Sequence, residues 1–298
     1  MERETKHIVL IIVTLVAVCA LISGGVVYSS GVSPPFTTVN SWSMQHGDES
    51  QIGIIDTGDM VLVKDPGKVS IRSYVEGYND GYSMFGDYGD VIIYKRGDNQ
   101  NPVIHRAILY LEYNGDKTWS APALADFPAD RWSNGGNTDY NHLKGTLMIN
   151  GLRYTHTLNA SLDLDKLATP NVSSGYVPHS GYVTLGDNNS AFDQSSGITE
   201  GLIENERIKS VAWIEIPWTG TVKMAFSGDS DILDQHVPNS IPSLALWIIS
   251  IVAILTAFSF IYDQRTYIKV RKELEIEKQT PSPSLPLEPD NDDNQFLD

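Results

Sequence analysis

The chain has almost no cysteine and little positive charge, and both shortages exclude classes of protein. Its 298 residues hold 21 Lys and Arg against 37 Asp and Glu, a net charge of −16. Because binding to nucleic-acid phosphates needs clustered Lys and Arg, the sequence predicts no nucleic-acid partner. The single cysteine, Cys19, excludes an intramolecular disulfide framework and a zinc site built from cysteines.

Several common site signatures are also absent. The chain contains no GxxxxGK[ST], no GxGxxG and no HExxH motif, so the usual markers of nucleotide-binding and zinc-peptidase sites are missing. Charged residues are only 19% of the chain, below the roughly 25% of an average soluble domain. Two long uncharged runs near the ends hold much of the apolar content.

These two runs predict two membrane-spanning helices. They cover residues 8–28 and 241–262, which are 21 and 22 residues long, and about 20 apolar residues cross the roughly 30 Å hydrocarbon core as a helix. The first run is longer than the about 7–15 apolar residues of a secretory signal, which favours an uncleaved anchor.

Basic residues beside the runs predict their orientation. Arg3 and Lys6 precede the first run, and four basic residues follow the second between positions 265 and 272. The positive-inside rule places both termini in the cytoplasm and the segment between the runs outside. That segment, residues 29–240, is acidic, with 14 Lys and Arg against 26 Asp and Glu.

Two further features concern modification and the C-terminal tail. The outer segment contains N-x-[ST] sequons at Asn159, Asn171 and Asn188, each a weak signal for glycosylation. After the second run, residues 263–278 are expected to continue the helix. The Pro- and Asp-rich tail is expected to be disordered from about residue 280.

The outer segment predicts a mainly β fold. Gly, Asp and Asn separate short β-branched runs, which cover residues 60–64, 91–95, 103–111, 181–185 and 210–216. The Tyr- and Gly-rich stretch 70–90 is expected to be a long polar excursion. The stretch 113–180, rich in Asn, Asp and Trp, indicates an inserted second lobe that divides the core into residues 29–112 and 181–240.

Short polar segments could carry chemistry, and each also has a plain structural explanation. Ser41 and Ser43 follow the first apolar run, where a polar linker would have the same composition. His105 closes a predicted hairpin; an imidazole can act as a general base near neutral pH, although most lone strand histidines are structural. Asp187 and Asp193 lie in a turn-rich loop that Asx turns alone could explain. Either carboxylate could orient a histidine.

In their order along the chain, these segments resemble type I signal peptidases, and more narrowly the archaeal and endoplasmic-reticulum branch. Residues 41–44 match the S-x-S-M of the serine segment, and Gly58 and Asp59 match the Gly-Asp that opens a strand. His105 stands where this branch has His and bacterial enzymes have Lys. Two further stretches match, G-D-N-N-x-x-x-D at 186–193 and I-P-x-x-G at 216–220.

This resemblance implies a signal-peptidase-like β catalytic core flanked by two transmembrane helices. The inserted lobe, 113–180, lies where bacterial members carry a second β domain. The implied substrates are preproteins that emerge from the Sec translocon, read as extended segments with small side chains at the −1 and −3 positions. The enzyme would be multi-pass in the cell membrane, embedded in the lipid bilayer, with its catalytic domain outside the cytoplasm.

The same resemblance implies a Ser-His-Asp mechanism without a metal or an organic cofactor. Ser43 would be the nucleophile and His105 its general base. The resemblance makes both Asp187 and Asp193 candidates for holding the histidine tautomer. We choose Asp193 to pair with His105, and Asp187 could instead support the site through hydrogen bonds and strand geometry. The backbone N–H of Ser43 and the hydroxyl of Ser41 would form the oxyanion hole.

Two departures from the family pattern lie beside the serine. Trp42 stands where the family usually has Gly, and His46 stands where it usually has Pro. His46 is three residues from Ser43 and is a rival base, although no family position supports it. A non-catalytic, membrane-anchored surface-binding or accessory protein with the same fold is the main alternative. In such a protein we expect Ser43, His105 or Asp193 to be substituted, and all three are present.

Overall fold

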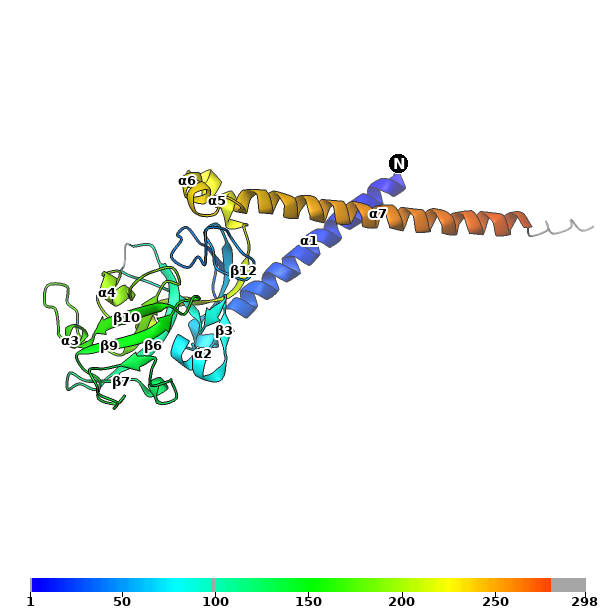
Figure 1. The fold of residues 1–298 in the computed structure, drawn as a ribbon. Coiled ribbons are helices and arrows are strands. Elements are labelled where there is room, and N and C mark those ends of the chain that lie inside the picture. The colour runs from blue at the N-terminus through cyan, green and yellow to red at the C-terminus, as the bar shows by residue number, and fades with distance from the viewer. Residues whose placement is uncertain (1, 98–99, 280–298) are drawn as a thin grey trace, which may run out of the picture. The chain divides into compact units, whose positions relative to one another are not determined.

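A computed structural model describes residues 2–97 and 100–279, and the chain divides into two units (Figure 1). The first unit extends to Leu244 and the second begins at Ala245. The fold is mainly β-sheet, with two helices that are long and apolar enough to cross a membrane. The tail expected to be disordered from about residue 280 lies outside the described residues.

The two long helices contain the two predicted apolar runs. Helix α1 (Glu2–Ser30) includes the apolar window Val13–Ser30. Helix α7 (Ser240–Gln279) includes the window Ser240–Lys272 and continues through the charged residues expected to extend it. Large apolar side chains along both windows are exposed within the chain itself, which is typical of helices that face lipid.

The main sheet of the first unit contains every strand predicted from the sequence. Its order is β1–β2–β12–β5–β6–β11, with β7 paired to β6. Neighbouring strands are antiparallel. The strands are β1 (Phe36–Thr38), β2 (Met60–Lys64), β5 (Val91–Tyr94), β6 (Val103–Tyr113), β7 (Trp119–Ser120), β11 (Gly181–Leu185) and β12 (Ile208–Ile216).

The inserted lobe adds a small sheet that packs on the main one. Its strands, in the order β10–β9–β8, are β8 (Trp132–Ser133), β9 (Thr146–Leu152) and β10 (Leu158–Asp163), followed by the short helix α3 (Leu164–Leu167). Trp119 and Leu147 of the insert are buried in the same apolar cluster as Leu109 and Val183 of the main sheet. The insert therefore shares its apolar core with the main sheet instead of folding around a core of its own.

The expected polar excursion over residues 70–90 is wrong in one respect, because part of it is buried. It contains helix α2 (Tyr74–Asp80) and the hairpin strands β3 (Ser83–Met84) and β4 (Asp87–Tyr88). Ser73 and Glu76 form a capping box that starts the helix. Tyr74 and Val75 are fully buried in the shared cluster. Two adjacent apolar residues among Gly, Tyr and Asp are too few to show helical periodicity.

Short elements complete the first unit. Helix α4 (Asp193–Ser196) follows β11, and helices α5 (Gly220–Ser227) and α6 (Ser230–His236) link β12 to α7. Three-residue or four-residue 3₁₀ turns cover Pro66–Lys68, Pro122–Ala125 and Asn205–Arg207. Met224, Leu233 and Val237 form a small cluster that holds α5 and α6 together.

Candidate active site

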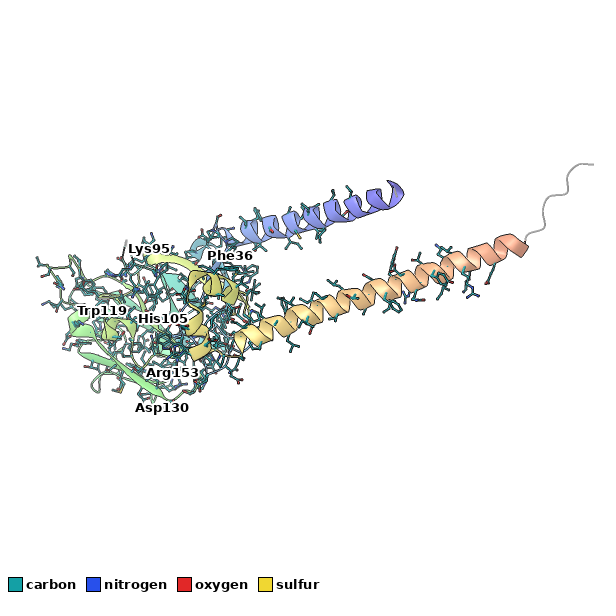
Figure 2. All side chains as sticks on the ribbon, turned by 90° about the horizontal axis from the view of Figure 1, so that it is seen from above. Phe36, Lys95, His105, Trp119, Asp130 and Arg153 are labelled. Atoms are coloured by element: carbon teal, nitrogen blue, oxygen red, sulfur yellow. The ribbon has the colours of Figure 1, made fainter. Side chains whose placement is uncertain are left out.

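Strand pairing brings a tyrosine to the same face of the sheet as His105. His105 of β6 pairs with Ile92 of β5, and paired residues point to one face. Tyr94, two residues after Ile92, therefore points to that face too. His105 is 3% exposed and Tyr94 is fully buried. Figure 2 labels His105 in the sheet-bearing unit.

Asp193 accepts hydrogen bonds from both of these side chains. Its Oδ2 lies 2.7 Å from His105 Nδ1 and 2.7 Å from the Tyr94 hydroxyl oxygen. Burial raises the pKa of Asp193, but the adjacent His105 and its hydrogen bond outweigh that effect and hold the pKa below its usual range. An ionised carboxylate only accepts, so Nδ1 carries a hydrogen, and the neutral form of the ring has its hydrogen-free nitrogen at Nε2.

The segment that carries Ser43 is fixed by the loop that precedes Asp193. Asn188 donates its backbone N–H to the Ser43 carbonyl oxygen at 2.7 Å, and its side-chain amide to the Trp42 carbonyl oxygen at 3.2 Å. Ser43 is half-buried, and its hydroxyl lies 3.2 Å from the hydroxyl of Ser41. Within the described ranges, the backbone N–H of Ser43 has no hydrogen-bond partner, so it remains able to donate to a bound group.

Gly186 allows the serine segment and the histidine to approach each other. A Cβ on this residue would lie 2.6 Å from the Ser43 carbonyl oxygen and 2.8 Å from His105 Nε2. These two atoms thus flank one small space that any larger residue would fill. In the part of the chain that the structure describes, no hydrogen bond joins Ser43 Oγ to His105. In enzymes generally, catalytic hydrogen bonds are often long or poorly aligned in the absence of substrate.

Asp187 has a different set of partners from Asp193. It forms a two-point ion pair with Arg106, with N–O distances of 2.8 and 2.6 Å, and both side chains are almost fully buried. Burial raises the pKa of Asp187, but the Arg106 charge and hydrogen bonds dominate and lower it. Arg106 Nη1 also donates to the carbonyl oxygens of Met84 and Gly89. Asp187 therefore ties the loop to the β3–β4 hairpin.

His46, the rival base, also contacts Asp187. Its Nε2 lies 2.9 Å from Asp187 Oδ2, and its ring stacks on Tyr154 with centroids 4.1 Å apart. The described contacts place no hydrogen bond between His46 and Ser43. The geometry therefore separates the two histidines: His105 is paired with Asp193, and His46 with Asp187.

The Gly58–Asp59 motif connects β2 to the closing segment. Asp59 is fully buried and accepts hydrogen bonds from the backbone N–H groups of Trp218 and Asp56 at 2.8 and 2.7 Å. Burial raises its pKa to about 8. Gly58 has a positive φ of 87°, which glycine adopts without strain. These residues join two matched stretches, 58–59 and 216–220, and take no part in the His105 contacts.

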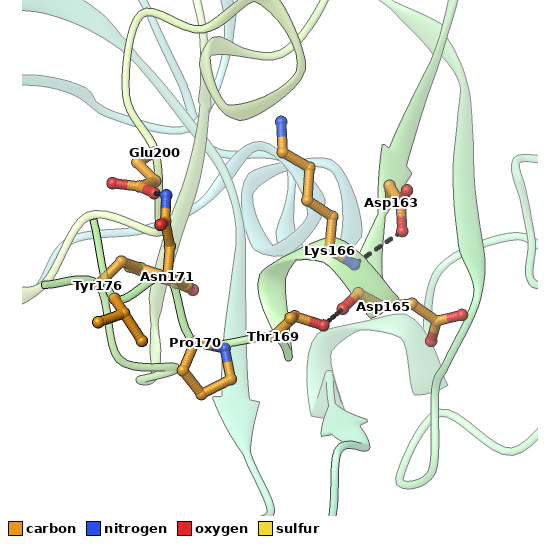
Figure 3. Close-up of a pocket in the computed structure, with 9 residues that line it drawn as sticks. Asp163, Asp165, Lys166, Thr169, Pro170, Asn171, Tyr176 and Glu200 are labelled. Atoms are coloured by element: carbon orange, nitrogen blue, oxygen red, sulfur yellow. Dashed lines mark hydrogen bonds between the residues drawn. The ribbon is translucent and has the colours of Figure 1, made fainter. Parts of the chain in front are cut away.

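Other features of the described residues lie away from this constellation. Over residues 2–97 and 100–279, no group of three or more His, Cys, Asp or Glu is arranged to hold a metal ion. A depression of about 490 Å³ is lined by Asp163 and Lys166 of the inserted lobe and by Glu200, among others (Figure 3). Glu200 there pairs with the Asn171 amide. No residue named above for the serine, histidine or aspartate contacts lines it.

Comparison with known proteins adds no family assignment. No protein-family model matches the chain, and no curated protein matches it.

The sequence did not single out Tyr94, Arg153 or Tyr154. Tyr94 could have been found from strand alternation once the register of residues 91–94 against 103–106 was known. Arg153 donates to the carbonyl oxygen of Asp187 and to the side-chain oxygen of Asn188, at 2.8 and 2.9 Å. No local sequence signal predicts that contact, because it depends on how the insert packs.

Proposed function

We propose that the protein is a membrane-bound serine endopeptidase that removes N-terminal signal peptides from secreted preproteins. The observation that carries the proposal is the buried His105–Asp193 pair at 2.7 Å, whose free Nε2 lies beside the backbone of Ser43 across Gly186. A serine hydroxyl needs an adjacent base to become a nucleophile. The order and geometry of these groups suit amide hydrolysis.

Each residue then has a chemical role. The Ser43 hydroxyl attacks the scissile carbonyl carbon while His105 Nε2 takes its proton, and the imidazolium later gives that proton to the leaving amine. Asp193 orients the ring and balances its positive charge. We assign the backbone N–H of Ser43, which has no partner among the described residues, and the neighbouring Ser41 hydroxyl as donors to the oxyanion. Water then releases the acyl group from Ser43.

The membrane helices and the sheet edge support the choice of substrate. Ser43 follows α1 closely in sequence, so its chemistry would take place near one membrane face. We propose that this is the outer face, with both termini in the cytoplasm. Basic residues precede the first apolar run and follow the second, and such residues mark the cytoplasmic ends of membrane helices. Strand β1 is at the sheet edge just before Ser41, and an extended peptide can add to such an edge. The proposed partners are preproteins, the Sec translocon and the bilayer.

A cleavage assay tests this proposal. The full-length protein in detergent or liposomes is incubated with a synthetic preprotein, and the N-terminus of the product is sequenced. We expect cleavage after the signal peptide, complete loss in Ser43→Ala, and a loss of about 10²–10³-fold in kcat for Ser41→Ala. Normal cleavage by Ser43→Ala would refute the serine mechanism. Binding of the preprotein without cleavage by the unmodified protein would favour the non-catalytic alternative.

A further inference from the structure

A turn of the inserted lobe reaches the segments that surround Ser43. The turn connects β9 to β10 and begins with Arg153 and Tyr154. Arg153 Nε donates to the Asp187 carbonyl oxygen at 2.8 Å, and its Nη2 donates to Asn188 Oδ1 at 2.9 Å. Asn188 in turn donates to the carbonyl oxygens of Trp42 and Ser43. A single residue, Asn188, therefore links the Arg153 guanidinium to the backbone of Trp42 and Ser43.

Tyr154 holds the same serine segment from its other end. Its ring stacks on His46 with centroids 4.1 Å apart and planes 10° apart, and His46 is hydrogen-bonded to Asp187. The His46 side chain is only 7% exposed. Arg153 therefore contacts the loop that fixes Ser43, and Tyr154 contacts the ring of His46, three residues after Ser43.

The turn contains two non-glycine residues with a positive φ. Arg153 has a φ of 69°, and His156 has a φ of 52°. Non-glycine residues in this region cost about 1–3 kcal/mol, and glycine adopts it freely. A turn needed only to reverse the chain would be more stable with glycine at position 153. The two hydrogen bonds that the Arg153 guanidinium makes to residues 187 and 188 point to a role for this side chain.

We propose that the inserted lobe positions the nucleophile segment through Arg153 and Tyr154. This inference rests on the proposed peptidase function. Both are positioning residues, because they act through Asn188 and His46 and contact neither Ser43 Oγ nor His105 among the described residues. The insert is therefore part of the active-site support, and it restricts the motion of residues 41–47 and 186–189.

The first test measures that motion without using activity. Amide hydrogen exchange is followed in the full-length protein in detergent for the unmodified chain, Arg153→Gly and Tyr154→Leu. Arg153→Gly removes the guanidinium while relieving the backbone strain, so the variant keeps its fold, which its Tm checks. We expect at least tenfold faster exchange in residues 41–47 and 186–189. Unchanged exchange there in both variants would overturn the proposal, whether or not the protein proves to be a peptidase.

Matched variants control for the chemistry of the changes. Lys117 is an exposed cation of the same insert with a positive φ of 67°, so Lys117→Gly makes the same kind of substitution away from the site. Tyr154→Phe keeps the ring that stacks on His46. We expect both variants to exchange like the unmodified protein. If Lys117→Gly loosened residues 41–47 as much as Arg153→Gly, the effect would be general softening of the insert and the proposal would fail.

The second test separates positioning from substrate binding. In the preprotein assay we expect Arg153→Gly and Tyr154→Leu to lower kcat by about 10–100-fold, the size of a misplaced nucleophile, with KM within about twofold. Lys117→Gly and Tyr154→Phe should keep kcat within about twofold. A changed KM at constant kcat would make these residues substrate contacts and refute positioning. Absence of cleavage by the unmodified protein would refute the peptidase proposal and leave the exchange result to decide this one.

Discussion

The Nδ1 nitrogen of His105 lies 2.7 Å from Oδ2 of Asp193, and both side chains are buried. The depressed pKa of Asp193 keeps its carboxylate ionised at neutral pH. A buried negative charge of this kind favours one tautomer of the ring and stabilises the imidazolium that forms when the ring takes a proton. The pair is therefore suited to a base whose other nitrogen must stay free.

Replacing Asp193 with Asn should remove this control of the tautomer. An amide can donate to Nδ1 and leave the hydrogen on Nε2, so we expect kcat to fall by about 10⁴-fold, as for similar triads. The exposed pair His142–Asp139 has the same geometry at 2.8 Å, so Asp139→Asn is a matched control that should keep full activity. Preprotein cleavage kinetics measure both. Equal activity of the Asp193→Asn variant and the unmodified protein would remove Asp193 from the mechanism.

Replacing Tyr94 with Phe should weaken the same carboxylate site more mildly. The change removes one of the two hydrogen bonds to Asp193 Oδ2 but leaves the ring in the core. A hydrogen bond to a charged group contributes about 1.5–3 kcal/mol, so we expect kcat to fall at least tenfold while the protein stays folded. The double variant with Asp193→Asn should be no less active than Asp193→Asn alone, because Tyr94 acts through that carboxylate. Additive losses would show an independent role.

The sequence predicted the sheet well because its strands are short apolar runs bounded by turn residues. The β2 and β11 runs were predicted with their observed bounds. The family resemblance made both Asp187 and Asp193 candidates for the partner of His105, and Asp193 was a choice between them. The strand pattern alone could not decide which of the two aspartates pairs with His105, because their loop has no periodicity.

Contacts that depend on register or packing could not be predicted. Tyr94 reaches Asp193 only because β5 pairs with β6 in one particular register. Arg153 and Tyr154 reach the site because the insert packs on the main sheet. The sequence around them contains no pattern that predicts this packing. Helix α2 was missed since its buried residues, Tyr74 and Val75, are adjacent and show no period.

Replacing Asp187 with Asn should affect stability more than replacing Asp193. Arg106 is 1% exposed, and in the described chain it forms its ion pair with the carboxylate of Asp187. Breaking a buried pair from one side leaves an uncompensated charge and costs about 3–5 kcal/mol. We expect a clear drop in Tm for Asp187→Asn and a much smaller one for Asp193→Asn. Thermal unfolding of both variants checks this order, and the reverse order would contradict the assigned structural role.

The stability of the first unit should fall as the pH rises from mildly acidic to alkaline values. Burial raises the pKa of Asp59 to about 8 and that of Glu215 to about 7. An unfolded aspartate titrates near 3.9, so between about pH 4 and pH 8 the folded chain binds more protons. The stabilisation from Asp59 is complete below its unfolded pKa and is lost as the pH rises through 8, by about 1.4 kcal/mol per pH unit.

Asp187 and Asp193 act in the opposite sense, because their pKa values are lowered on folding. Their contribution is present above the unfolded pKa and is lost in strong acid. We therefore expect the highest Tm in mild acid and a lower Tm at pH 8.5, with the alkaline decrease reduced in Asp59→Asn. A thermal unfolding series from pH 4 to 9 tests this. A Tm that rises steadily up to pH 8.5 would be inconsistent with the raised pKa of Asp59.

Replacing Gly186 with Ala should separate the serine from its base. The added Cβ would lie within 2.8 Å of three groups: the Ser43 carbonyl oxygen, His105 Nε2 and the Asn189 amide nitrogen. Contacts under 3 Å must be relieved by movement, and a 1 Å displacement of reacting groups can cost about 10²-fold in rate. Gly47 lies in the same serine segment, and a Cβ there would meet nothing closer than 3.7 Å. We therefore expect Gly186→Ala to lose at least 10²-fold in kcat while Gly47→Ala stays near the unmodified rate. Equal rates for the two variants would show that Ser43 and His105 do not approach each other across Gly186.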